Sequence, residues 1–127
     1  MKKCVPLALL SSVLLTACGP NKIVADLPSP DGKYHVEVRL CPQSGSLTWT
    51  EKTQVSVLPK GATEKCQGSL QAVAQFDSYG PQDQLQVEWI SATEVRAWHP
   101  QFNPEYGPQS ANYKPGNPIK LIFKPKP

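Results

Sequence analysis

The sequence predicts an all-β fold: a small antiparallel sandwich or open barrel of five to seven short strands with one disulfide bond. Three observations predict it. Residues 33–40 alternate strictly between apolar and polar side chains, which is typical of a half-buried strand. Other short apolar runs follow, separated by turn residues such as proline, glycine and aspartate. No stretch has a clear helical period, so packed β-sheets are the favoured architecture.

The strand expected at 33–40 is the clearest element of the chain. It follows Asp31-Gly32, a turn signal. Its apolar side chains share one face and its polar side chains share the other: Tyr34, Val36, Val38 and Leu40, against Lys33, His35, Glu37 and Arg39. This alternation predicts one face on the core and one face in water. We therefore expect His35 among charges on a solvated face, without a catalytic or metal-binding role.

Further strands are expected at residues 54–58, 84–90, 94–98 and 119–123, with a less regular segment at 66–76. Residues 60–65 indicate a turn. In the less regular segment an alternation is visible over Leu70, Ala72, Ala74 and Phe76, although its alanines and glutamines also allow a short helix. The short connection Ser91-Ala92-Thr93 predicts a hairpin between 84–90 and 94–98. An edge strand can also form over Ile23-Val24-Ala25.

The amino terminus has the layout of an export signal. Lys2 and Lys3 form a basic start, and an apolar run follows without any charged residue. A helix that crosses a membrane needs about 20 apolar residues, and the stretch between Lys3 and Cys18 is too short for that. The sequence therefore predicts a signal peptide over residues 1–17.

The end of this signal, Leu15-Thr16-Ala17-Cys18, resembles the lipobox of bacterial lipoprotein precursors. The resemblance implies cleavage before Cys18, a diacylglycerol thioether on that cysteine, and anchoring in the membrane by two or more acyl chains. The alternatives are a plain secretory signal with an incidental cysteine, or a short buried helix. Because Gly19 and Pro20 follow, where an aspartate commonly marks inner-membrane retention, the resemblance favours the outer membrane facing the periplasm in a Gram-negative host.

A fainter resemblance concerns the rest of the chain. The turn and strand of residues 29–34 and the hairpin around 87–95 look like those of small uncharacterised β-rich bacterial lipoproteins. These motifs support the fold and transfer no function. The expected organisation is a removed signal over 1–17, a lipidated cysteine and tether over 18–30, one β-rich domain over 31–124 and a tail over 125–127.

Removal of the signal changes the charge and the cysteine count. The whole chain has 13 basic and 10 acidic residues; without Lys2 and Lys3 it has 11 against 10, a net charge of +1. Nucleic acid is therefore not an expected partner. Cys41 and Cys66 are the cysteines left beside the lipid site, and in an oxidising compartment we expect them to form a disulfide.

The sequence contains no recognisable catalytic or cofactor motif. The mature chain has two histidines and lacks G-x-S-x-G, S-x-x-K, H-E-x-x-H and glycine-rich phosphate loops. A metal site that combines the cysteines with His35 or His99 is weak, because no C-x-x-C or H-x-x-x-H spacing supports it. We therefore expect no enzymatic activity, no cofactor and no metal.

Residues 99–118 break every strand pattern and are rich in proline. Long loops in compact domains are often functional, and aromatic side chains on a stiff backbone make rigid contact surfaces. The candidate partner-binding residues are Trp98, Phe102, Tyr106 and Tyr113. The alternative is that these aromatics pack over one open end of the sheet and cap the core.

The expected function is that of an envelope-anchored lipoprotein that binds another envelope protein without enzymatic activity. An immunity or inhibitor protein is one version of this function. The alternative is a structural or assembly component of a secretion or cell-surface apparatus. The expected partners are the membrane, through lipid on Cys18, and an unidentified envelope protein.

Overall fold

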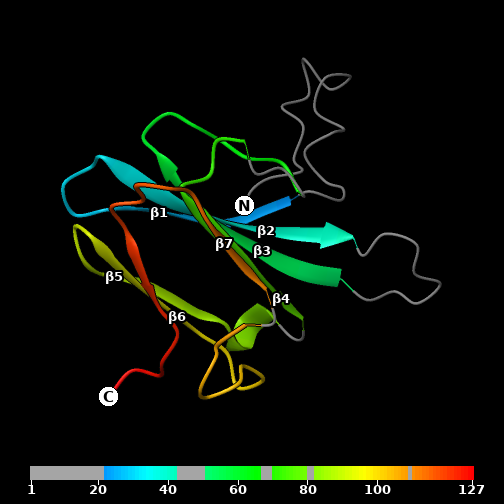
Figure 1. Ribbon diagram of the computed structural model, residues 1–127. Helices are drawn as coiled ribbons and strands as arrows, with labels where there is room; N and C mark the ends of the chain where they lie inside the picture. Colours follow the sequence, from blue (N-terminus) through cyan, green and yellow to red (C-terminus); the bar gives the residue numbers. More distant parts are fainter. Residues whose placement is uncertain (1–21, 43–50, 67–69, 80–81, 109) are drawn as a thin grey trace, which may run out of the picture.

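The computed structural model describes residues 22–42, 51–66, 70–79, 82–108 and 110–127 (Figure 1). Its strands are β1 (Lys22–Pro28), β2 (Tyr34–Pro42), β3 (Glu51–Pro59), β4 (Ala74–Tyr79), β5 (Gln86–Ser91), β6 (Glu94–Trp98), β7 (Ala111–Tyr113) and β8 (Lys120–Ile122). Within these ranges the only helical element is the 3₁₀ turn η2 (Gln82–Gln84), and none is long enough to cross a membrane. The all-β prediction is confirmed.

The larger sheet has five antiparallel strands in the order β1-β2-β3-β4-β7. The register places Val36 of β2 opposite Val57 of β3, and Val38 opposite Val55. Residues with period two along each strand therefore line one apolar face. β1 and β7 are the two edge strands.

The smaller sheet has the order β5-β6-β8. The predicted hairpin is present as the antiparallel pair of β5 and β6, connected through Ala92 and Thr93. β8 runs parallel to β6, with Glu94 opposite Lys120. Parallel neighbours need a long connection, and residues 99–119 supply it. The second sheet is thus mixed, whereas the sequence led us to expect antiparallel pairing.

The core fills the space between the two sheets, which form a sandwich and not a closed barrel (Figure 1). Its buried apolar residues are Val36, Val38, Val55, Val57, Ala74, Phe76, Val95, Ala97, Phe102, Ile119 and Leu121. Phe76 contacts Phe102 and Phe123 edge to face, with ring centroids 5.8 and 5.3 Å away. Across one margin, the indole N–H of Trp89 donates to the Leu27 carbonyl at 2.8 Å and links β5 to β1.

The second face of β2 is buried, so the prediction of one solvated face is wrong. Glu37 is 3% exposed and Arg39 is 9% exposed. After β3 the chain crosses this face as a segment of residues 60–66, here called the strap, which lies on the side of the sheet away from β5 and β6 (Figure 1). The polar side chains of β2 therefore meet strap atoms in place of water.

The segment 66–76 also differs from its prediction. The strand begins only at Ala74, and Leu70 is 89% exposed although it was placed in the same alternation as the buried Ala72, Ala74 and Phe76. The cause is local: Val73 already pairs with Val57 through its N–H, whereas Leu70 lies before that contact. β7, within the loop-like region 99–118, is a strand that the sequence pattern did not indicate.

Candidate functional site

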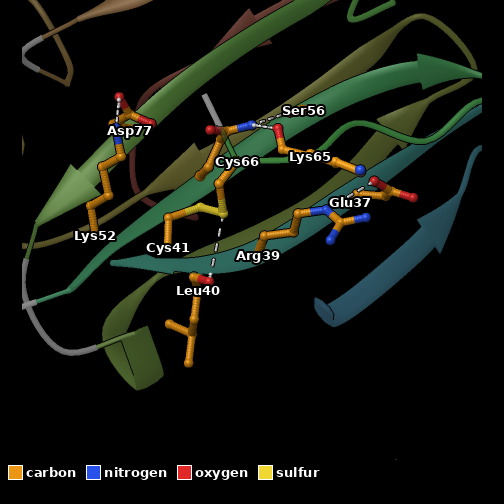
Figure 2. The surroundings of a disulfide bond; sticks show 10 residues. Glu37, Arg39, Leu40, Cys41, Lys52, Ser56, Lys65, Cys66 and Asp77 are labelled. Carbon is orange, nitrogen blue, oxygen red and sulfur yellow. Dashed lines mark hydrogen bonds and ion pairs between the residues drawn. A yellow bond between two sulfur atoms is a disulfide. The ribbon is translucent and has the colours of Figure 1, made fainter. Parts of the chain in front are cut away.

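The predicted disulfide between Cys41 and Cys66 is confirmed, with a Cα–Cα distance of 5.7 Å. Cys41 lies on the strap-facing side of β2, where Glu37 and Arg39 are also buried. Cys66 is the last residue of the strap (Figure 2). The bond closes a loop with a sequence separation of 25 residues. On the chain-entropy model such a loop stabilises a fold by about 3–4 kcal/mol. The disulfide therefore clamps one end of the strap to the sheet.

A polar network around the buried side chains of Glu37 and Arg39 holds the middle of the strap. The Glu37 carboxylate accepts hydrogen bonds from the Thr63 hydroxyl at 2.7 Å and the Glu64 backbone N–H at 3.2 Å. The Arg39 guanidinium donates to the Thr63 hydroxyl at 3.0 Å and lies 3.5 Å from Glu37. Thr63 thus accepts from Arg39 and donates to Glu37, so the strap hydroxyl joins the two opposite charges of β2.

Further contacts extend the network along the strap. Gln54 of β3 donates its amide N–H to the Lys65 carbonyl at 3.3 Å. The Glu64 carboxylate, on a residue only 5% exposed, accepts the backbone N–H of Gln71 at 3.1 Å. Buried polar groups of this kind are costly when unpaired and specify one arrangement when paired. The strap is therefore an integral part of the fold.

His35 holds the first turn of the strap. Its Nδ1 lies 2.8 Å from the Asp26 carboxylate and its Nε2 lies 2.7 Å from the Ala62 carbonyl. Burial acts to lower the pKa of His35, but the hydrogen bonds to Asp26 and Ala62 and the charges of Asp26 and Glu37 outweigh it, so this pKa is raised above 6.5. Both partners are acceptors, and the imidazolium form alone can donate to both.

The four candidate partner-binding residues lie in separate places. Trp98 is half-buried on β6, and Tyr113 is 51% exposed on β7, which belongs to the other sheet. Phe102 is 9% exposed and contacts Phe76, and Tyr106 is 77% exposed. The structure therefore does not bring these four side chains into one surface.

The loop of residues 99–108 contains a hydrogen-bonded turn, which its proline-rich composition did not indicate. The Asn103 side chain accepts the backbone N–H groups of Glu105 and Tyr106 at 2.8 and 3.2 Å, which forms a tight turn. Gly107 has φ +80°, and a Cβ there would meet the Phe123 ring at 2.8 Å. His99 is 1% exposed and its Nδ1 accepts the Gln101 N–H. Asn103-Pro104 and Gly107 are the sequence signals that point to this turn.

Two large apolar side chains are exposed near the β7 edge of the larger sheet. Tyr113 is on β7 itself, and the backbone carbonyl of Leu70 contacts the Lys114 ammonium that follows β7. Beside Tyr113 is a hollow of about 250 Å³, lined by Ala72, Ala74, Gln75, Asn112, Tyr113 and Lys114. We call Leu70, Tyr113 and this hollow the β7 patch. Exposed apolar patches beside an open strand are typical of protein-binding surfaces.

Cys18, the predicted lipid site, lies outside the described residues. Of the described side chains, Asp26, His35 and Glu37 bring together three groups that can bind a metal ion.

No family model, curated protein or solved structure matches the chain.

Proposed function

We propose that the protein is a lipid-anchored component of the bacterial envelope that binds another envelope protein through the β7 patch, without enzymatic activity. The observation that carries the proposal is the exposure of two large apolar side chains near the edge strand β7: Leu70, which is 89% exposed, and Tyr113, which is 51% exposed. Keeping a leucine side chain in water forgoes about 1.5–3 kcal/mol of burial energy, which a partner that covers it recovers. Lipid on Cys18 confines the domain to a membrane, in the outer membrane facing the periplasm when the host is Gram-negative.

The edge strand supports this binding mode. Among the described strands β7 pairs with β4 alone, so its other side offers backbone N–H and C=O groups. An extended segment of a partner can pair with such an edge while its side chains enter a neighbouring hollow. An immunity or inhibitor protein would use this surface for one partner. An assembly component of a secretion or cell-surface apparatus would use it within a larger complex.

The binding surface is tested by the paired substitutions Leu70→Ser and Tyr113→Ser. The intact lipoprotein is cross-linked in membranes, the captured protein is purified, and its Kd for the wild type and the variant is measured. We expect the double variant to raise this Kd by roughly tenfold or more, which corresponds to about 1.4 kcal/mol or more. Both side chains are exposed, so the melting temperature is expected to stay unchanged.

The matched control carries Ile90→Ser and Tyr106→Ser, which remove two other exposed apolar side chains, 40% and 77% exposed, from different elements. It is expected to bind like the wild type. Equal affinity of both double variants would contradict the β7 patch, and failure of the wild type to retain any protein would contradict the binding function. One stoichiometric partner favours an inhibitor, whereas several co-purifying envelope proteins favour an assembly role.

The anchor is tested separately by Cys18→Ala. We expect this variant to lose labelling by radioactive palmitate, because the thiol that accepts the diacylglycerol is absent. A Cys4→Ala variant should keep its label, since Cys4 lies within the predicted signal peptide. Palmitate incorporation that persists in Cys18→Ala would refute the lipoprotein assignment.

A further inference from the structure

Three potential metal ligands lie on the strap-facing side of β1 and β2. Asp26 of β1 is directly opposite Glu37 of β2, and His35 precedes Glu37 by two residues, so its side chain lies on the same face. The ligand atoms of the three residues all lie within 4.8 Å of one another. An open hollow beside them, lined in part by Lys60 and Gly61, connects the group with solvent. We propose that Asp26, His35 and Glu37 form a binding site for a divalent transition-metal ion of the Zn²⁺ type.

The Ala62 carbonyl selects the atom of His35 that would bind the metal. A carbonyl only accepts hydrogen bonds, so its 2.7 Å contact keeps a proton on Nε2. Nδ1 then faces the Asp26 carboxylate, 2.8 Å away. Histidines that bind metals almost always donate their other ring N–H to a carbonyl or carboxylate in this way. The metal would take the place of the proton that Nδ1 and Asp26 share in the metal-free protein.

The two carboxylates differ in exposure, and the difference suits a metal site. Glu37 is buried, and its two oxygens are oriented by the Thr63 hydroxyl and the Glu64 N–H. Each carboxylate oxygen has a second lone pair, so these bonds leave capacity for an ion. The Asp26 side chain is 51% exposed and can move by the ångström or so that bonds of about 2.0–2.2 Å require.

The charge and donor type indicate the class of ion. Two carboxylates match the charge of a divalent cation, and the Arg39 guanidinium, 3.5 Å from Glu37, lowers the affinity that they would otherwise give. One imidazole nitrogen and two carboxylate oxygens suit Zn²⁺ or a similar ion and disfavour Cu(I), which prefers sulfur ligands. With three protein ligands, a fourth position stays open to water.

The test titrates ZnCl₂ into the full-length mature protein in detergent after chelator treatment, by calorimetry and by ¹⁵N NMR of the histidine rings. We expect saturable binding of one ion, a rise in melting temperature, and a large shift of His35 Nδ1 while Nε2 keeps its proton. Asp26→Asn is the main variant because Asp26 is exposed and its removal leaves the network of Glu37, Thr63 and Arg39 intact. It is expected to weaken binding by roughly tenfold or more.

His35→Gln should weaken binding as much, and Asp83→Asn, an exposed carboxylate in η2, serves as the matched control that binds like the wild type. Absence of saturable binding in the wild type would overturn the proposal. So would wild-type affinity in both Asp26→Asn and His35→Gln, because the ion would then lie elsewhere. Neither outcome depends on the β7 patch, so this test and the test of protein binding fail separately.

Discussion

Replacing Phe102 with alanine is expected to lower the free energy of unfolding by about 3–5 kcal/mol, the usual cost of deleting a buried phenyl ring. Phe102 comes from the proline-rich loop, yet it is 9% exposed. Its ring lies edge to face against Phe76 and Phe123, with centroids 5.8 and 6.0 Å away. Alanine would leave a cavity between the two sheets, and these two rings would each lose a neighbour.

Urea unfolding with the disulfide intact measures this change. Tyr106→Ala is the matched control, because it removes an aromatic ring from the same loop at a position that is 77% exposed. We expect it to change stability by no more than about 0.5 kcal/mol. Similar losses in the two variants would show that the loop is held by something other than Phe102. Phe102→Leu, which fills most of the cavity, should lie between the two.

Replacement of Glu37 with leucine is expected to cost about 3–5 kcal/mol, as is usual when one member of a buried ion pair is removed. Leucine has a similar volume, so the loss would come from the polar groups that it leaves behind. Arg39 would lose the carboxylate 3.5 Å away, and the Thr63 hydroxyl and the Glu64 N–H would lose the acceptor that they share. The strap would then lack its central attachment.

The control is Glu88→Leu on β5. Glu88 also forms an ion pair with an arginine on the neighbouring strand, Arg96 of β6, at 3.1 Å. The Glu88 side chain, however, is 39% exposed. Exposed ion pairs contribute about 0–1 kcal/mol, so the control should change the unfolding free energy by no more than that. Thr63→Val is a milder variant for the case in which Glu37→Leu does not fold, with an expected loss of about 1–3 kcal/mol. Equal effects of the two glutamate variants would contradict a buried network.

Local patterns were sufficient to predict most strands and the disulfide. The alternation of residues 33–40 identifies β2, and the short connection at Ala92 and Thr93 identifies the β5–β6 hairpin, because both signals lie within a few residues. Pairing of Cys41 with Cys66 follows from the count of cysteines that remain when the predicted signal peptide and lipid site are set aside. β7 has only three residues, too few for any period to be visible.

The fate of the polar face could not be predicted by alternation alone. Glu37 and Arg39 look the same in sequence whether they meet water or a strap, since the covering segment is about 26 residues further along the chain. One signal was available. Cys41 shares the parity of His35, Glu37 and Arg39, so a disulfide to Cys66 must bring the chain across the polar face. The grouping of Asp26 with His35 likewise needs the register of β1 against β2, which no local pattern contains.

The strand order of the larger sheet also limits the distance between the β7 patch and the membrane to which a lipid on Cys18 would attach the protein. With lipid on Cys18, the backbone reaches Lys22 in four residue steps, at most about 14 Å when fully extended. The Lys22 end of β1 would therefore lie near the headgroups. The order β1-β2-β3-β4-β7 places the β7 patch four strand spacings away, about 19 Å across the sheet. The register aligns Tyr113 with Leu27, five residues along β1 from Lys22, so Tyr113 lies about 25 Å from Lys22. With lipid on Cys18, Tyr113 would stay within about 40 Å of the bilayer even at full stretch, so a partner must itself extend into this layer to be bound.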